Sequence, residues 1–504
     1  MSAGAPSVAE RTEHVDVLIV GAGLSGIGAA CRLVKDFPRK TVAVLESREA
    51  SGGTWDLFRY PGVRSDSDMF TLGYSFRPWD SSTTIAPGAS ILDYVRETAR
   101  QYGVDRLIRY RQRVVAADWS TADARWTVTV DRGPEGAATY TCSFLFLGTG
   151  YYRYDEGFTP SFPGEERFEG RVVHPQHWPA DLDYAGKRVV VIGSGATAVT
   201  LVPTLAEKAE RVTMLQRSPG YIAVLPSVDD GFDRLLARHV PKRAAAAVSR
   251  WKGITQSLVS YRISRRSPER MKGILRSQAR KRLPDDFDIA KHFQPKYDPW
   301  DERLCIVPNG DLFTAIRDGR ADVATDTIDT FTERGIRLTS GEELDADVIV
   351  TATGLNLLLF GGMALSVDGT AIDPAERVTY KGMMLEGVPN LAFAIGYTNA
   401  SWTLKIDLVV HYVERLLRHL DRTKQTTVVP VPPRDVGERT PLIDLSSGYI
   451  RRGIHLMPKQ GAEAPWRLHQ NYPLDVKLFR LGRLRGDGLR FSGRVEAPEW
   501  VMAE

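Results

Sequence analysis

The chain has 504 residues, of which 43% are hydrophobic and 25% charged, and its formal net charge is +4. This length exceeds what one hydrophobic core organises, so two or three domains are expected, with the composition of an ordinary globular enzyme. No stretch approaches the roughly 18 apolar residues of a membrane span, and the three widely spaced cysteines have neither a disulfide-rich nor a metal-binding pattern.

The chain opens on a polar segment, and its first apolar run, Val15–Val20, is far shorter than the core of a signal peptide. We therefore expect a cytoplasmic protein in a reducing compartment, with no metal site and no nucleic-acid partner. The oligomeric state is left open.

Residues 14–46 predict a strand, a glycine turn, a helix and a second strand. Gly21, Gly23 and Gly26 form GxGxxG directly after the first strand, where the turn and the helix N-terminus favour a pyrophosphate. Glu46 ends the second strand, and an acid there accepts hydrogen bonds from ribose hydroxyls but repels a 2′-phosphate. This first unit is therefore expected to bind FAD.

The same pattern restarts at Lys187. Gly193 and Gly195 form the second glycine turn, GSGATA, which also contains Thr197 and carries Ala198 in the third place. The strand-end position holds Arg217 in place of an acid, and a guanidinium suits a 2′-phosphate. The second unit is expected to bind NADPH.

Two dinucleotide sites indicate a redox enzyme that passes electrons from NADPH through FAD. Flavoproteins of this kind that reduce disulfides need a reactive cysteine pair, and Cys31, Cys142 and Cys305 offer none. Oxygen is therefore the expected electron acceptor.

A strongly basic segment, residues 231–284, interrupts the α/β alternation and looks helical. It carries fifteen Lys or Arg against two acids, a net +13, so the remainder of the chain carries −9. The segment is either a solvated helical face or a surface that contacts anionic lipid or the phosphates of NADPH. Peripheral membrane contact is thus one expectation.

Residues 168–179 carry a further motif, FxGxxxHxxxWP, with Phe168, Gly170, His174 and Trp178 at its specified positions. This motif resembles the fingerprint of Baeyer–Villiger monooxygenases, the class B flavoprotein monooxygenases. The segment GGTW with Thr54 and Trp55, followed by RYPG and Asp66, resembles a second signature of that family. The similarity covers nearly the whole chain.

The resemblance implies NADPH- and O₂-dependent oxidation of hydrophobic ketones to esters or lactones by a C4a-peroxyflavin, with sulfoxidation of thioethers or thioamides beside it. It implies that Arg303 is the active-site arginine and that Asp66 pairs with it. It implies a linker role for His174, hydrogen-bonded to backbone, and a packing role for Trp178. Trp55 covers the flavin or belongs to the core, and both alternatives stay open.

We predict an α/β protein with two Rossmann-like dinucleotide-binding domains and a helical insertion. The FAD-binding domain comprises residues 1–155 and 355–504, the latter including the C-terminal tail. The NADPH-binding domain comprises 156–224 and 296–354, and the insertion 225–295. A helix near 401–421 either caps an ordinary loop or directs its N-terminus at the flavin.

Two alternative functions stay open at this point. One is an S- or N-oxygenating flavin-containing monooxygenase, which differs in substrate rather than in cofactors. The other belongs to a different class, a flavin-bound protein that senses NADPH or attaches to a membrane without catalysis.

Overall fold

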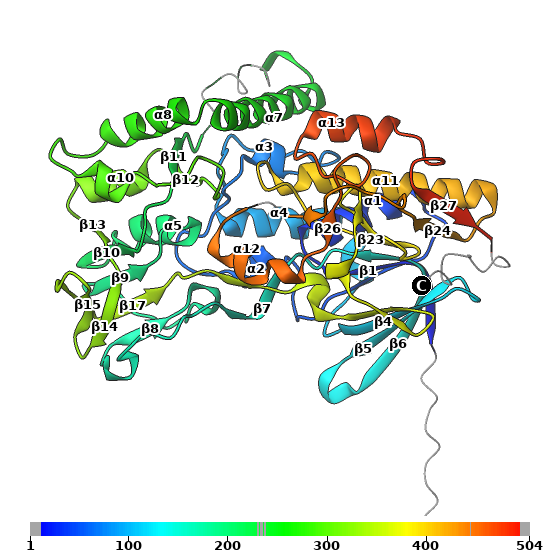
Figure 1. Ribbon diagram of the computed structural model, residues 1–504, viewed down its shortest axis with the longest axis horizontal. Coiled ribbons are helices and arrows are strands. Elements are labelled where there is room, and N and C mark those ends of the chain that lie inside the picture. The colour runs from blue at the N-terminus through cyan, green and yellow to red at the C-terminus, as the bar shows by residue number, and fades with distance from the viewer. Residues whose placement is uncertain (1–11, 229–230, 232–234, 236–237, 444, 494–504) are drawn as a thin grey trace, which may run out of the picture.

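The computed structural model describes residues 12–228, 231, 235, 238–443 and 445–493. The polar N-terminal residues 1–11 and residues 232–234 and 236–237 of the basic segment, among them Asp233 and Arg234, lie outside the described residues. Two sheet-centred lobes stand side by side, and a helical layer runs along one edge of both (Figure 1).

The larger sheet has nine strands and mixes parallel with antiparallel pairs. Its central strand β1 (Glu13–Val20) is parallel to β6 (Ala137–Leu147) and to β2 (Val42–Leu45). The end of β1, VLIV, is buried throughout, as expected for a parallel strand covered on both faces. The other strands of this sheet are β3 (Ile108–Arg109), β4 (Arg113–Ser120), β5 (Arg125–Asp131), β19 (Ala364–Val367), β20 (Thr370–Ile372) and β23 (Leu391–Phe393).

The second sheet has five strands, all parallel, in the spatial order β13-β10-β9-β17-β8. Their bounds are β8 (Arg171–Val173), β9 (Arg188–Ile192), β10 (Arg211–Gln216), β13 (Ala321–Thr325) and β17 (Val348–Thr351). Both sheets take strands from before and after the basic segment, in the order that the sequence predicts. The limits of the predicted domains stay a prediction.

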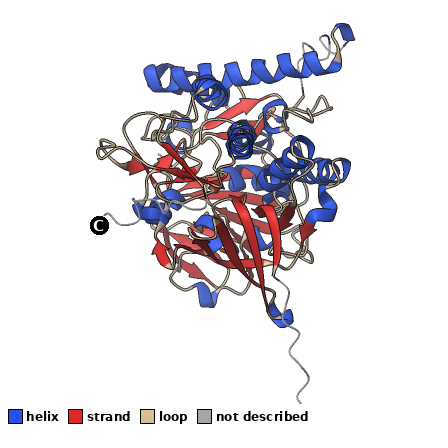
Figure 2. Cartoon of the chain, turned by 90° about the vertical axis from the view of Figure 1, so that its right-hand side faces the viewer, coloured by secondary structure: helices blue, strands red, loops and turns tan. Residues whose placement is uncertain are grey.

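In the turned view most of the helices lie above and to the right of the strands (Figure 2). In the first lobe α1 packs against α11, and in the second α5 packs against α10. The main helices are α1 (Leu24–Asp36), α4 (Gly88–Gln101), α5 (Ala196–Leu205), α7 (Lys242–Arg266), α8 (Pro268–Arg280), α10 (Asp311–Arg317) and α11 (Trp402–Thr423). Short helices are α2 (Thr54–Leu57), α3 (Met69–Leu72), α9 (Ile289–His292), α12 (Gly448–Gly453) and α13 (Tyr472–Val476).

Short ribbons complete the fold. Their strands are β7 (Tyr152–Gly157) with β18 (Leu355–Leu357), β11 (Ile222–Leu225) with β12 (Cys305–Pro308), β14 (Ile328–Thr332) with β15 (Gly335–Leu338) and β16 (Glu343–Asp345), β21 (Thr379–Tyr380) with β22 (Met384–Leu385), β24 (Thr427–Pro430) with β27 (Leu489–Ser492), and β25 (Thr440–Pro441) with β26 (Lys459–Gln460). The β7–β18 ribbon connects the two lobes. None of the helices in the described ranges is long and apolar enough to cross a membrane.

The predicted fold class is confirmed. Each lobe contains the expected strand, glycine turn and helix, and the basic segment includes the helices α7 and α8. These helices lie on the upper edge in Figure 1, above α3 of the first lobe and β11 of the second.

Candidate active site

One cleft of about 1050 Å³ receives residues from both lobes. Of the residues singled out in the sequence, it brings together Gly23, Thr54, Trp55, Asp66, Gly193, Gly195, Thr197, Arg217 and Arg303. The remaining ones do not line the cleft: they are Gly21, Gly26, Glu46 and the four fingerprint residues.

The first glycine turn is closed by contacts that exclude side chains. Gly21 has φ +98°, and a Cβ on Gly26 would lie 1.8 Å from the carbonyl oxygen of Gly21, so neither position tolerates a larger residue. Gly23 ends the turn at the N-terminus of α1 and lines the cleft. Glu46 holds the turn from β2, because its Oε2 accepts a hydrogen bond of 2.8 Å from the backbone N of Ala22.

The GGTW loop is fixed by a backbone hydrogen bond to this turn and by a buried carboxylate of its own. Gly52 N donates to the carbonyl oxygen of Ala22 at 2.9 Å. Asp56, buried in α2, accepts from Arg48 Nη2 at 2.6 Å and from Arg96 Nη2 at 2.7 Å. Trp55 lines the cleft and also packs against the main core of the first lobe, and its predicted role of covering the flavin stays a prediction.

The second glycine turn leaves room for a ligand. Gly193 has φ +139°, and a Cβ there would meet the carbonyl oxygen of Ala352 at 2.4 Å. A Cβ on Gly195 would meet nothing within 4 Å, so the start of α5 faces open space. Arg217, exposed at the end of β10, lines the same cleft. Both turns therefore fit the two dinucleotides expected from the sequence.

Arg303 and Asp66 meet inside the cleft. Arg303 Nη2 lies 2.8 Å from Asp66 Oδ2, and about one third of each side chain is exposed to solvent. The attraction of Asp66 raises the pKa of Arg303 above its ordinary value, against the opposing effect of burial. The guanidinium is therefore a permanent positive charge in the wall of the cleft.

Aromatic side chains form the wall around Arg303. The ring of Tyr151 lies 4.5 Å from that of Tyr152 and 5.6 Å from that of Trp402, and Tyr152 lies 6.3 Å from Tyr449. All four line the cleft, and burial raises the pKa of Tyr152 and Tyr449 so that both phenols stay neutral.

Sequence reasoning missed this aromatic wall. Tyr151 and Tyr152 follow the carboxyl end of β6, a place where ligands bind in open α/β sheets, and this position was the available signal. Tyr449 lies far along the chain in α12, and no motif marks it.

The helix predicted near 401–421 is α11, which begins at Trp402. Ala400 and Trp402 line the cleft, so the N-terminus of a 22-residue helix lies at its edge. Trp402 is held by a 2.8 Å hydrogen bond from its Nε1 to Ser25 Oγ. A helix N-terminus there favours negative charge on a group bound beside it.

The fingerprint residues pack in and around the linker between the lobes. His174 Nδ1 accepts a hydrogen bond from the backbone N of Gln176 at 3.2 Å, and Nε2 lies 3.2 Å from the carbonyl oxygen of Gly354. Burial lowers the pKa of His174, which favours the neutral ring that these two contacts require. Phe168 is buried against Phe331, and Trp178 packs on Tyr184.

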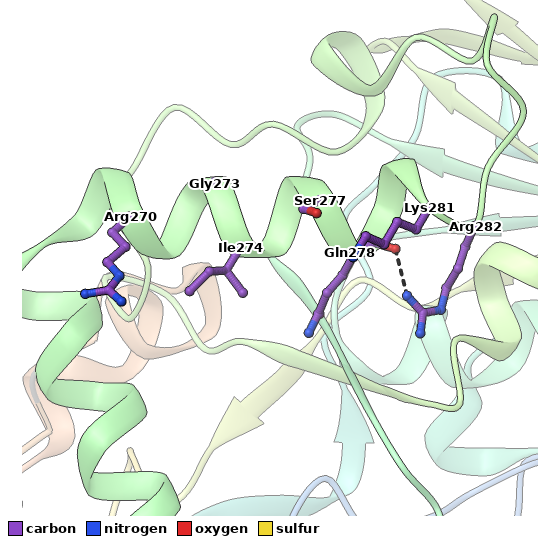
Figure 3. Close-up of a pocket in the computed structure, with 7 residues that line it drawn as sticks. All are labelled: Arg270, Gly273, Ile274, Ser277, Gln278, Lys281 and Arg282. Atoms are coloured by element: carbon purple, nitrogen blue, oxygen red, sulfur yellow. Dashed lines mark hydrogen bonds between the residues drawn. The ribbon is translucent and has the colours of Figure 1, made fainter.

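The basic segment takes no part in lining the cleft, as far as its residues are described. A separate hollow of about 550 Å³ lies along α8, where Arg270 and Ile274 point to the same side of the helix (Figure 3). The absence of the described residues of the segment from the cleft lining disfavours the predicted alternative in which the segment touches the phosphates of NADPH.

Comparison with known proteins adds to this geometry. A family model described as flavin-binding monooxygenase-like matches residues 74–360, and one described as an NAD(P)-binding Rossmann-like domain matches residues 19–79. The FAD-containing monooxygenase EthA of Mycobacterium tuberculosis is 54% identical over 96% of this chain and 99% of its own length.

Two solved structures share the fold. A steroid monooxygenase bound to NADP is 25% identical, with a TM-score of 0.75, over 95% of this chain and all of that one. An open form of cyclohexanone monooxygenase, 19% identical with a TM-score of 0.73, covers 96% of this chain and all of that one, and supports the fold alone.

Proposed function

The chain belongs to the flavin-binding monooxygenase family, and on that premise we propose that it inserts one oxygen atom beside the carbonyl of hydrophobic ketones and also oxygenates soft sulfur. It is an NADPH-dependent monooxygenase with FAD as cofactor, so the expected enzyme class and cofactors are confirmed. Because the chain belongs to a family of enzymes, the alternative of a flavin-bound protein without catalysis no longer applies.

The observation that carries this proposal is the Arg303–Asp66 pair in an aromatic-walled cleft reached by both glycine turns. When bound, FAD supplies the oxygen chemistry, using two electrons from NADPH. One atom of O₂ enters the product and the other leaves as water.

The residues of the chain supply position, charge and exclusion of water. Arg303 stabilises negative charge that develops on oxygen, and Asp66 holds the guanidinium in place. Tyr152 and Tyr449 keep water from this part of the cleft and offer an apolar surface to the substrate. Arg217 binds the 2′-phosphate of NADPH, while Glu46 supports the FAD turn.

A product screen with the purified enzyme, NADPH and O₂ tests the proposal. Esters or lactones from hydrophobic ketones support it, with sulfoxides from thioethers as a second product. Sulfoxides without any ester would favour an S-oxygenase, and hydroxylated primary amines would favour an N-oxygenase. NADPH consumption without an oxygenated product from the whole panel would contradict it.

We also propose that the outer face of α7 and α8 contacts an anionic membrane surface. On α7 the apolar side chains Val248, Trp251 and Val259 are 43–49% exposed and share one side of the helix. Basic side chains lie on the same side of α7 and on the corresponding side of α8. The proposed lipid-binding face consists of Val248, Trp251, Val259, Arg262, Arg266, Arg270, Ile274 and Lys281.

The basic charge and the exposed apolar side chains of this face together favour contact with lipid over a face that is only solvated. An apolar stripe flanked by arginines suits the boundary between acyl chains and anionic headgroups. Apolar side chains grouped on one side of a helix also differ from the singly scattered apolar residues of ordinary surfaces. With no spanning helix in the described residues, the contact is peripheral.

Vesicle co-sedimentation tests this face. Binding to vesicles with anionic phosphatidylglycerol, but not to pure phosphatidylcholine, is expected, and Arg262→Gln/Arg266→Gln should weaken it. Arg106→Gln/Arg113→Gln removes two exposed charges at the larger sheet and is the matched control. Equal binding by wild type and the face variant would reject the contact.

A further inference from the structure

Arg303 lies at the end of a tight turn, Asp298–Arg303, which the helices of the insertion contact. Asp301 N donates to the carbonyl oxygen of Asp298 at 3.0 Å, and Asp298 N donates to Asp301 Oδ2 at 3.1 Å. Between them Trp300 has φ +75°, a conformation that a side chain with a Cβ rarely adopts. Such a conformation persists only where the surroundings hold it.

Contacts from α7 and α8 hold this turn from one side. Arg265 Nη1, near the end of α7, donates to Asp301 Oδ1 at 2.6 Å. Lys272 Nζ of α8 lies 2.7 Å from Asp298 Oδ1. The ring of Tyr261 on α7 meets Trp300 edge to face at 5.7 Å.

The opposite side of the turn is tied to the segment that carries Tyr449. Both the backbone N and the Oγ of Ser446 donate to the carbonyl oxygen of Asp301, at 2.9 and 2.8 Å. Asp301 thus joins α7, the turn itself and the aromatic wall of the cleft. Arg303 follows two residues later, with its guanidinium on Asp66.

We propose that Asp301 is a positioning residue for the oxygenation reaction, and that Arg265 of α7 acts through it to fix the guanidinium of Arg303. The inference deepens the proposed function and rests on it, because it concerns the placement of the arginine to which that function assigns the key charge. Part of the basic segment therefore faces inward and serves the active site, while the lipid-binding face points outward.

The ion pair between Arg265 and Asp301 is partly exposed, so its effect on the position of Arg303 can be measured apart from its effect on global stability. Arg265 is 48% and Asp301 37% exposed, and ion pairs of this kind contribute little to global stability. Reaction geometry is more demanding, since a misplacement of about 1 Å can cost roughly 10²-fold in rate. Loss of the pair is therefore expected to change product formation more than melting temperature.

The test compares Asp301→Asn, Arg265→Met and their combination with Arg276→Met as control. Asparagine keeps an oxygen for Asp298 N but replaces the charged oxygen that accepts from Arg265 with an NH₂ group. Arg276 is exposed on α8, one turn beyond Lys272, and lies outside both the turn contacts and the lipid-binding face. Three quantities are measured: oxygenated product per NADPH, the rate of flavin reduction by NADPH, and hydrogen exchange of the peptide covering residues 296–304.

The expected result is a roughly tenfold loss of product per NADPH in both single variants, with peroxide released instead and flavin reduction unchanged. The double variant should be no worse than either single variant, because both break one interaction. Hydrogen exchange in 296–304 should rise in all three, and the control should behave as wild type.

The inference would be overturned if Asp301→Asn changed neither the oxygenated product per NADPH nor the hydrogen exchange of residues 296–304. It would also be overturned if the losses of product in the two single variants added up in the double variant. A wild-type enzyme that forms no oxygenated product would instead reject the proposed function. In that case the exchange measurement still decides whether Arg265 fixes the turn.

Discussion

Arg303 Nη2 lies 2.8 Å from Asp66 Oδ2 in the wall of a cleft that both glycine turns reach. The two residues come from opposite sides of the helical insertion, one before α3 and one after α8. The fold thus brings together a positive charge and an acid that lie far apart in the sequence.

Removing the positive charge should stop oxygenation without stopping flavin reduction. In Arg303→Ala, product formation is expected to fall by about 10²–10³-fold, as for loss of a preorganised oxyanion donor. Arg303→Lys should recover only part of this, because an ammonium lacks the planar fork that Asp66 holds. Stopped-flow absorbance for reduction and mass spectrometry for product separate the two steps, and unimpaired product would remove the assigned role.

Discrimination between NADPH and NADH should depend on Arg217. Arg217→Ala is expected to lower kcat/KM for NADPH roughly tenfold or more, since charge-assisted hydrogen bonds contribute about 1.5–3 kcal/mol each. The value for NADH should stay close to that of wild type, because NADH lacks the 2′-phosphate. Equal losses with both coenzymes would show that Arg217 serves the structure of the turn instead.

Local sequence signals explain how much of the site was predictable. Each glycine turn is encoded within some 30 residues of strand, turn and helix, so Gly21 to Glu46 and Gly193 to Arg217 are recognisable from the chain alone. The pairing of Asp66 with Arg303 rested on family resemblance, because nothing in the local pattern joins two positions so far apart.

Other features had no signal in the sequence. Tyr449 joins the aromatic wall from α12, and Asp301 meets Arg265 only because the insertion folds back on the turn. Long-range side-chain pairs depend on tertiary packing, which periodicity and motif spacing do not report.

A buried ion pair joins α11 to α13. Lys405 Nζ lies 2.8 Å from Asp475 Oδ2, with 0% and 2% of their side chains exposed, and Tyr397 OH donates to the same oxygen at 2.6 Å. Breaking such a pair leaves an uncompensated charge, so Asp475→Asn should destabilise the protein by about 3–5 kcal/mol. Calorimetry should show a lower Tm for Asp475→Asn and a partial recovery in Lys405→Met/Asp475→Leu. A single variant as stable as wild type would contradict the account.

Acid stability should depend on Glu414 of α11. Burial alone would raise the pKa of Glu414, but hydrogen bonds from His411 and Arg32 outweigh it and lower the pKa to about 2. A depressed folded-state pKa contributes stability above the unfolded value near 4.5, and this contribution is lost as the pH falls toward 2.

The size of this effect is roughly 3 kcal/mol at neutral pH, from the free energy per pKa unit. Glu414→Gln should therefore be less stable than wild type at pH 7, and the difference should shrink as the pH falls from about 5. Thermal unfolding followed from pH 7 to pH 4 measures it, and a difference independent of pH would exclude Glu414 as the responsible group.

Oxygen labelling tests the central claim most directly. Purified enzyme, NADPH and a hydrophobic ketone under ¹⁸O₂ should give an ester or lactone that contains one ¹⁸O atom beside an unlabelled carbonyl oxygen. A product without ¹⁸O, or complete conversion of O₂ to peroxide with every ketone and thioether tried, would contradict the account.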